Sequence, residues 1–184
     1  MALKTTPICD IGNHAPDFSL SDPDGKIWSL ENCRGENGTL IMFICNHCPY
    51  VQAIHQLLVR DTLELLDHGV KSVAIMSNDI NSYPMDSPEN MKKAAEEFGY
   101  PFPYLFDETQ ATAQAYGAVC TPDFFGYNAN QQLQYRGRLD ETTPSKSTPE
   151  SKRELFEAMK LIARTGEGPD AQIASMGCSI KWRQ

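Results

Sequence analysis

The stretch that decides the fold reads Thr39-Leu-Ile-Met-Phe-Ile-Cys-Asn-His-Cys-Pro-Tyr50. Its first six residues form a short apolar run, which is typical of a strand buried on both faces. Proline is tolerated in the first turn of a helix but not in its interior, so Pro49 predicts a helix that begins close to His47 or Cys48. Cys45 and Cys48 therefore stand between a buried strand and a helix start.

This position suits thiol chemistry. The free N–H groups and the dipole of a helix N-terminus stabilise an anion, and only the thiolate form of a cysteine attacks a disulfide. We expect Cys45 to be that thiolate, with a lowered pKa, and His47 to lower it further when protonated. Cys48 lies on the same side of the first turn, from which it can attack a mixed disulfide on Cys45. The segment predicts a redox-active dithiol.

A zinc site is the alternative for a Cys-x-x-Cys motif. Structural zinc sites usually show a second ligand pair, and this chain has no second Cys-x-x-Cys. Cys120, Cys178 and His47 are the remaining candidate ligands. The position of the motif after a buried strand favours the redox interpretation, so we expect no metal and no other cofactor.

Outside this segment the pattern alternates strands with helices and ends in a hairpin and a helix, which predicts an α/β fold with a mixed central sheet. No linker divides the chain, so we expect one domain over residues 1–184, with a core over about 12–165 and an irregular tail over 166–184. The apolar residues of that tail predict that it docks on the core. The predicted strands are 17–20 and 26–30 (a hairpin around Asp24-Gly25), 39–44, 70–77, 104–107, 123–127 and 133–136. The predicted helices run from 47 or 48 to 69, from 88 to 99, from 107 (capped by Asp107) to 116, and from Thr148-Pro-Glu150 to 165. Residues 78–86 are expected to form a loop at the rim.

Composition narrows the partners. The net charge is −8 and the basic residues are scattered, which argues against nucleic acid. No stretch approaches the roughly 20 apolar residues that span a bilayer, so no membrane partner is expected. The N-terminus lacks the apolar core of a signal peptide, and we expect a cytoplasmic protein in which the six cysteines stay reduced. The sequence leaves the oligomeric state open.

A second motif is Val119-Cys-Thr-Pro-Asp-Phe-Phe125, in which a proline after threonine opens a strand. Such a proline is a candidate for a cis peptide bond. With this motif the chain resembles the thioredoxin superfamily, in its redoxin branch of peroxiredoxin-like (AhpC/TSA) and thiol–disulfide oxidoreductase-like proteins. The residues that carry the resemblance are Ala15-Pro-Asp-Phe18, Cys45-Asn-His-Cys-Pro49, Thr121-Pro122, Tyr135-Arg-Gly-Arg138 and, for an uncharacterised subgroup, Gly177-Cys-Ser-Ile-Lys-Trp182.

The resemblance implies a thioredoxin-like fold with Cys45 and Cys48 as the catalytic pair. It implies that Pro122 is a cis-proline packed opposite Cys45 and that the Thr121 backbone pairs with a bound substrate as a strand would. Asn46, His47 and Pro49 then support the pair. Thioredoxin has a buried carboxylate six residues before its first active-site cysteine, and here that position is Thr39.

The resemblance leaves three functions open. The first is thiol–disulfide exchange with protein or small-molecule disulfides. The second is an antioxidant thiol peroxidase acting on hydroperoxides. This function is disfavoured because, when Cys48 is aligned with the reactive cysteine of peroxiredoxins, Ile41 and Cys45 stand where those proteins have a proline and a threonine. The third is a non-catalytic binding module or metal carrier, although copper carriers of this fold need a late histidine and all four histidines precede residue 69.

Four further residues have their own predictions. Cys120 is expected to lie near Cys45, and Cys178 to be an additional resolving thiol in the docked tail. Arg136 and Arg138 are expected at an exposed strand end, where one of them would support an anion near the site.

Overall fold

The computed structural model describes residues 2–7, 11–146 and 151–183, and it has the mixed central sheet flanked by helices that the sequence predicts. The strands are β1 (Leu3–Thr5), β2 (Ser19–Ser21), β3 (Ile27–Ser29), β4 (Gly38–Phe43), β5 (Val70–Met76), β6 (Tyr104–Phe106), β7 (Cys120–Thr121), β8 (Asp123–Asn128), β9 (Leu133–Tyr135) and β10 (Met176–Ser179). The helices are α1 (Leu30–Cys33), α2 (Pro49–Gln52), α3 (His55–Leu66), α4 (Pro88–Phe98), α5 (Ala111–Tyr116), α6 (Glu154–Thr165) and the short 3₁₀ helix η1 (Pro84–Asp86). No helix in this part of the chain has the length and apolar character needed to cross a membrane.

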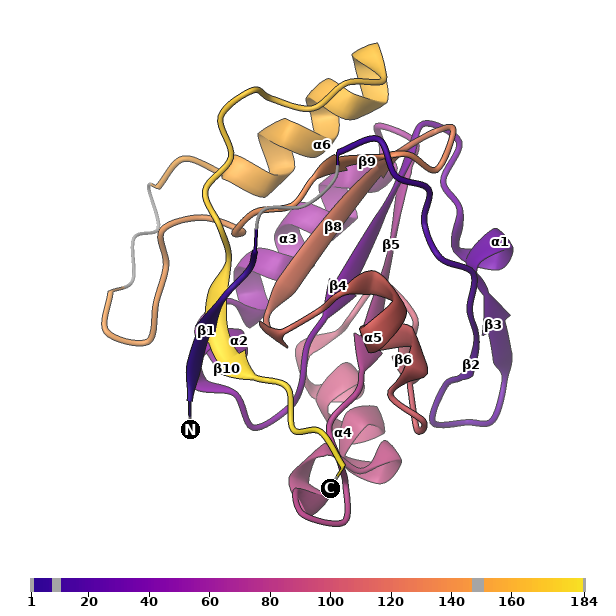
Figure 1. Cartoon of the computed structure of the whole chain (residues 1–184), viewed down its shortest axis with the longest axis vertical. Helices are drawn as coiled ribbons and strands as arrows, with labels where there is room; N and C mark the ends of the chain where they lie inside the picture. The colour runs from indigo at the N-terminus through magenta and orange to yellow at the C-terminus, as the bar shows by residue number, and fades with distance from the viewer. Residues whose placement is uncertain (1, 8–10, 147–150, 184) are drawn as a thin grey trace.

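The main sheet has the strand order β3-β2-β6-β5-β4-β8-β9 (Figure 1). β4 lies inside it, parallel to β5 and antiparallel to β8. Every residue of β4 is buried, which confirms the strand predicted from the apolar run. Because β4 and β5 are parallel, the loops that follow them meet at one edge of the sheet, and this edge carries Cys45.

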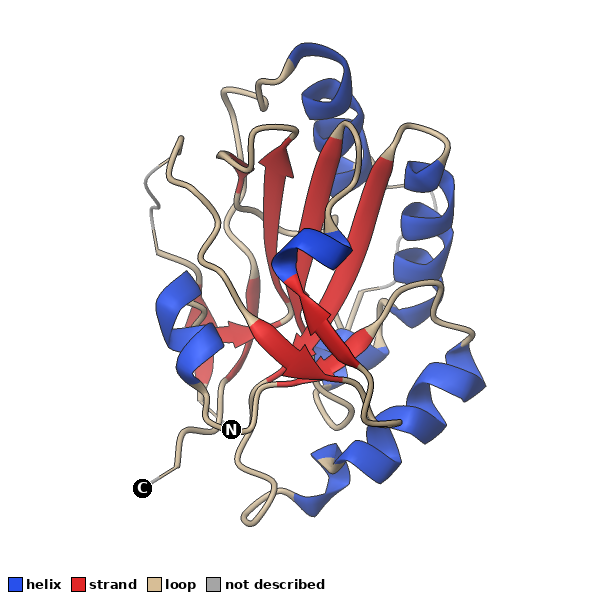
Figure 2. Ribbon diagram, turned by 90° about the vertical axis from the view of Figure 1, so that its right-hand side faces the viewer, coloured by secondary structure: helices blue, strands red, loops and turns tan. Residues whose placement is uncertain are grey.

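Both faces of the sheet are covered (Figure 2). Successive side chains of a strand point to opposite faces, and Leu40 and Met42 pack with residues of α3, α4 and α6, while Ile41 and Phe43 pack with residues of α1 and α5. Two apolar clusters result, one on each face, and the dithiol belongs to the cluster on the side of α3 and α6.

The helix after Cys48 begins as predicted but is interrupted. Cys48 is the N-cap residue of α2 and Pro49 is its first helical residue. The prediction of one helix to Gly69 is wrong, because the Ile54 N–H bonds to the carbonyl of Val51, three residues back, and Ile54 leaves the helical region before α3 starts. α2 is therefore a single turn of four residues, separated from α3 by Ala53 and Ile54.

The remaining elements follow the predictions closely. β2 and β3 form the predicted hairpin. Ser87 caps α4, and the Asp107 carboxylate accepts hydrogen bonds from the first turn of α5. Residues 148–150, the predicted start of the last helix, lie outside the described residues, and α6 is helical from Glu154.

The C-terminal tail docks on the domain core, but it is not wholly irregular. Met176–Ser179 forms β10, which lies between β1 and β7 in a second, three-stranded antiparallel sheet. Figure 1 shows β1 and β10 side by side next to α2. The tail is therefore anchored to the short strand β7, which immediately precedes Pro122 and β8.

Candidate active site

The dithiol lies at the carboxyl end of β4, where the chain leaves the sheet and enters α2. Cys45 is 2% exposed and Cys48 is fully buried, and both are free thiols. The structure thus places the pair between a buried strand and a helix start, as the sequence predicts.

Thr121 lies against both sulfur atoms. Its hydroxyl oxygen is 3.3 Å from Cys45 Sγ, and its carbonyl oxygen is 3.0 Å from Cys48 Sγ, a contact in which the protonated Cys48 thiol is the donor. The Thr121–Pro122 peptide bond is cis, as predicted. Two of the motifs that carry the resemblance, Cys45-Asn-His-Cys-Pro49 and Thr121-Pro122, therefore meet at one site.

Asp86 organises the loop between the two cysteines. Its fully buried carboxylate accepts hydrogen bonds from the backbone N–H of Asn46 at 2.9 Å, from the backbone N–H of His47 at 3.4 Å, from His47 Nδ1 at 2.7 Å and from Asn78 Nδ2 at 2.8 Å. Tyr104 adds a hydrogen bond from its hydroxyl to Asn46 Oδ1 at 3.1 Å. The Cys45–Cys48 loop is thus tied to the loop that follows β5.

Asp86 was not predicted as a site residue, because residues 78–86 were expected only to form a loop at the rim. The signal was present in the order of the elements. Two buried parallel strands end at the same edge of a sheet, so a carboxylate in the loop after the second strand was a candidate for contact with the motif after the first.

Asp86 puts a negative charge beside Cys45. Burial raises the pKa of Asp86, but the hydrogen bonds from His47, Asn78 and the Asn46 backbone outweigh burial and hold it below its ordinary value. His47 Nδ1 also lies 4.0 Å from Cys45 Sγ, and the His47 ring stacks on Tyr83. His47 Nε2 is buried with no hydrogen-bond partner among the described residues, which favours the tautomer that donates from Nδ1 to Asp86.

The expectation that Cys45 has the lowered pKa is wrong for this geometry. A hydrogen bond from the Cys45 thiol lowers the pKa of Cys48 to about 5 against the opposing effect of burial, and Cys178 and Thr121 supply further donors. The same hydrogen bond, burial and the Asp86 charge raise the pKa of Cys45 well above its ordinary value. The helix terminus alone predicted the thiolate on Cys45, but the hydrogen bond with Cys48, burial and the Asp86 charge together disfavour it there.

The other cysteines differ in their relation to the pair. The Cys178 thiol and backbone N–H both hydrogen-bond to Cys48. Cys120 is buried next to Thr121, where its thiol donates to the Pro122 carbonyl at 3.6 Å and burial raises its pKa. Cys33 lies in the other apolar cluster, and Cys9 lies outside the described residues. Of the two additional thiols predicted, Cys178 is the one that contacts the dithiol.

Cys45, His47 and Asp86 form a group that could hold a metal ion, because their ligand atoms lie within 4.8 Å of one another. Thiolate, imidazole and carboxylate are all zinc ligands. In the structure the His47 and Asp86 atoms hydrogen-bond to each other, so the group is already paired without an ion.

The prediction for Arg136 is wrong. Arg136 is buried because it pairs with the buried Asp123 at 3.1 Å and donates to the Gly117 carbonyl at 2.7 Å. Arg138 is partly exposed and pairs with Glu154 at 2.6 Å. Both guanidinium groups are engaged by carboxylates, so neither is placed to hold an anion at the dithiol.

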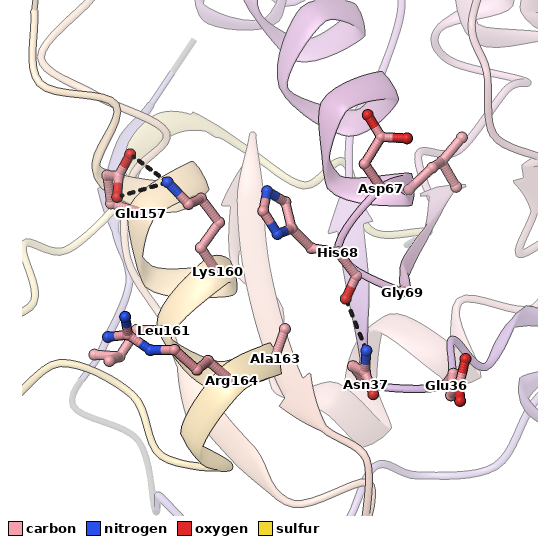
Figure 3. Close-up of a pocket in the computed structure, with 11 residues that line it drawn as sticks. Glu36, Asn37, Asp67, His68, Gly69, Glu157, Lys160, Leu161, Ala163 and Arg164 are labelled. Atoms are coloured by element: carbon pink, nitrogen blue, oxygen red, sulfur yellow. Dashed lines mark hydrogen bonds and ion pairs between the residues drawn. The ribbon is translucent and has the colours of Figure 1, made fainter.

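A cavity of about 870 Å³ lies elsewhere, between the end of α3, α6 and the residues before β4 (Figure 3). In it Asn37 Nδ2 donates to the His68 carbonyl at 3.0 Å, and Lys160 faces Glu157. Asn37 directly precedes β4, whereas Cys45 follows it, so this cavity is at the opposite end of the strand and is not part of the dithiol site.

Fold and site together define a redoxin, a thioredoxin-like α/β protein with a Cys-x-x-Cys pair opposite a cis-proline. The chain belongs to the AhpC/TSA family, whose model matches residues 11–138. It is 26% identical over 157 residues to the thiol-disulfide oxidoreductase ResA of Geobacillus thermodenitrificans, a match that covers 82% of this chain and 78% of that protein.

Solved structures agree with the fold. An uncharacterized conserved protein of Geobacillus kaustophilus is 45% identical with a TM-score of 0.94, covering 100% of this chain and 97% of the other. A hypothetical protein of Sinorhizobium meliloti is 34% identical with a TM-score of 0.93, covering 97% and 98%. A thiol:disulfide interchange protein of Chlorobium tepidum, 18% identical with a TM-score of 0.63 over 85% and 99%, shares the fold.

Proposed function

We propose that the protein is a thiol–disulfide oxidoreductase that exchanges electrons with protein or small-molecule disulfides through Cys45 and Cys48. The observation that carries the proposal is the convergence of both sulfur atoms on Thr121. The naming of the ResA relatives as thiol-disulfide oxidoreductases supports the same chemistry.

The reaction needs two exchanges. Cys45 attacks one sulfur of the substrate disulfide, which forms a mixed disulfide and releases the first substrate thiolate. Cys48 then attacks the Cys45 sulfur, which forms the Cys45–Cys48 disulfide and releases the second thiolate. Two electrons pass to the substrate. The lowered pKa of Cys48 suits it to the second step, and the hydrogen bond between the two sulfurs is the route by which Cys45 passes its proton to Cys48 before the first step.

The lowered pKa of Cys48 also favours a second candidate function, reduction of hydroperoxides. The Cys48 thiolate would attack the peroxide O–O bond, form a sulfenic acid and release an alcohol or water. Cys45 would then condense with the sulfenic acid to give the same disulfide and a second water. Hydroperoxides are therefore the alternative substrates, and an antioxidant role depends on them.

Single cysteine variants separate the two reactions. In disulfide exchange, Cys48→Ser should accumulate mixed disulfides on Cys45 with insulin as the substrate, and Cys45→Ser should accumulate none. In the peroxidase reaction, hydrogen peroxide should produce sulfenic acid at Cys48 of the Cys45→Ser variant within the turnover time of the wild type. Cys33→Ser is the matched control, because Cys33 is a buried thiol in the other apolar cluster. Fast sulfenic acid at Cys48 with no insulin turnover by the wild type would replace the exchange proposal with the peroxidase.

We also propose that the protein acts in the cytoplasm. A reducing compartment would keep Cys45 and Cys48 as free thiols, ready to reduce a substrate. Cell fractionation combined with acid-quenched alkylation of thiols would test it, and recovery of the protein outside the cytoplasm with the pair oxidised would contradict it.

A further inference from the structure

The tail strand β10 lies where a substrate strand is expected. It pairs antiparallel with β7, with Cys178 opposite Thr121 and Ser179 opposite Cys120. The flanking residues extend the contact, since Ser175 Oγ donates to the Pro122 carbonyl at 2.7 Å and the Ile180 N–H donates to the Val119 carbonyl at 3.1 Å. The backbone next to the dithiol is therefore already occupied by a segment of the same chain.

Gly177 makes this contact close. A Cβ atom at residue 177 would lie 2.0 Å from the Thr121 carbonyl oxygen, a distance that no side chain can adopt without displacement of the backbone. The absence of a side chain lets the tail approach the same carbonyl that contacts Cys48.

The residue that this approach delivers is a thiol. Cys178 is 4% exposed, belongs to the same apolar cluster as Cys45 and Cys48, and hydrogen-bonds to Cys48 through both its thiol and its backbone N–H. Cys178 pairs with Thr121, whose carbonyl oxygen lies 3.0 Å from Cys48 Sγ, so a movement of the side chains can bring the two sulfur atoms to the separation that a disulfide requires.

We propose that Cys178 is a third redox-active thiol, which exchanges with the Cys45–Cys48 disulfide to form a Cys48–Cys178 disulfide. The inference rests on the proposed function, which supplies the first disulfide. The Cys178 sulfur attacks the Cys48 sulfur, the Cys45–Cys48 bond breaks and a Cys48–Cys178 bond forms. Cys45 leaves as a thiolate and takes the proton that Cys178 loses. The exchange is redox-neutral, needs no other oxidant, and covalently fastens β10 across the site.

The electrostatics of the reduced state fit this order of events. Burial and the neighbouring Cys48 thiolate raise the pKa of Cys178 to about 12, so Cys178 is protonated while the pair is reduced. Once Cys48 enters a disulfide it carries no charge, and that cause of the raised pKa is gone, while Lys181 continues to lower it. Cys178 therefore becomes a better nucleophile only after the dithiol has been oxidised.

The test is disulfide mapping on the full chain. Reduced Cys45→Ser protein is treated with glutathione disulfide, quenched with acid, alkylated and digested without reduction for mass spectrometry. We expect a Cys48–Cys178 disulfide and release of two glutathione molecules per chain. Cys45→Ser/Cys178→Ser should stop at Cys48 bound to glutathione. The inference is overturned if mass spectrometry finds Cys178 alkylated, and therefore still a free thiol at the quench, in the Cys45→Ser variant. This holds whether Cys48 is free or bound to glutathione.

Gly177→Ala tests the geometry with every thiol retained. Its Cβ must move about 1.4 Å from the Thr121 oxygen to reach an ordinary contact of 3.4 Å, and a misplacement of about 1 Å can already slow a positioned reaction about a hundredfold. We expect that loss in the rate of Cys48–Cys178 formation in the Cys45→Ser background, with Met176→Ala, an exposed position of the same strand, as the control. Equal rates in the Gly177→Ala and Met176→Ala proteins would overturn the inference. The proposed function is tested separately, by insulin reduction with the wild-type protein and by the Cys45–Cys48 disulfide that forms in it.

Discussion

Replacing Asp86 with Asn should lower the pKa of Cys45. Asp86 is fully buried, carries a negative charge, and its charge is one of the causes that raise the pKa of Cys45. Asn has nearly the same shape and its Oδ1 can still accept from the Asn46 backbone N–H. The substitution therefore removes the charge and keeps much of the loop geometry.

The size of the effect follows from the distance. The ligand atoms of Cys45 and Asp86 lie within 4.8 Å of each other. Two unit charges at that separation repel by about 0.9 kcal/mol at the dielectric constant of water and by about 3.5 kcal/mol at an effective value of 20. Since one pKa unit corresponds to about 1.4 kcal/mol, the pKa of Cys45 should fall by roughly 0.6 to 2.5 units. His47, which hydrogen-bonds to Asp86, offsets part of the charge and moves the result toward the lower figure.

The assay is thiolate absorbance against pH in a Cys9→Ser/Cys48→Ser background. Burial raises the pKa of Cys33 to about 11 and also raises those of Cys178 and Cys120, so the titration is carried into the alkaline range and the difference from a protein that also carries Cys45→Ser reports on Cys45. Asp79→Asn is the matched control, because Asp79 lies in the same loop and hydrogen-bonds to Ser82 rather than to the Cys45–Cys48 loop. An unchanged midpoint in Asp86→Asn, or an equal shift in Asp79→Asn, would refute the role of the Asp86 charge.

Three further perturbations have directions fixed by the structure. His47→Ala should lower the reduction potential of the dithiol, measured by equilibration with glutathione, because Asp86 loses the His47 hydrogen bond and its charge then disfavours the negatively charged reduced pair more strongly; an unchanged or higher potential would contradict this. Arg136→Ala should reduce the free energy of unfolding in urea by about 3 to 5 kcal/mol, because it leaves Asp123 buried without its partner, whereas Arg138→Ala should cost no more than about 1 kcal/mol. His55 is buried with its pKa lowered to about 4, against 6.5 when unfolded, so stability should fall as the pH decreases from about 6.5 to 4, and this fall should be smaller in His55→Leu.

The sequence predicted those parts of the fold that depend on local signals. The apolar run before Cys45 needed no knowledge of its partners to be assigned as a buried strand, and Pro49 fixed the helix start because its ring excludes it from a helix interior. The cis bond at Pro122 was predicted from the family resemblance and from the position of proline at the start of a strand. These signals lie within a few residues of what they determine.

The features that the sequence did not predict depend on contacts between distant segments. Asp86 reaches the dithiol because β4 and β5 are parallel neighbours, and its charge adds to the hydrogen bond with Cys48 and to burial in raising the pKa of Cys45. Arg136 was expected to be exposed because it is charged, yet Asp123, thirteen residues earlier, makes its burial tolerable. β10 has four residues and no alternating pattern, so its strand character arises from pairing with β1 and β7.

The tail strand β10 also limits substrate access to the dithiol in every reaction proposed for it. Both cysteines are buried, and the Thr121 backbone, which the family resemblance assigns to substrate binding, is paired with Cys178. A protein substrate must therefore displace β10 before it can pair there. The sheet that holds β10 consists of strands of two, three and four residues, and small units of this kind open at a lower free energy than a buried strand such as β4. Reduced protein can then open to a substrate, while a Cys48–Cys178 disulfide would hold it closed until a reductant cleaves that bond. Substrate access to Cys45 would therefore depend on whether Cys178 is a free thiol or is bonded to Cys48.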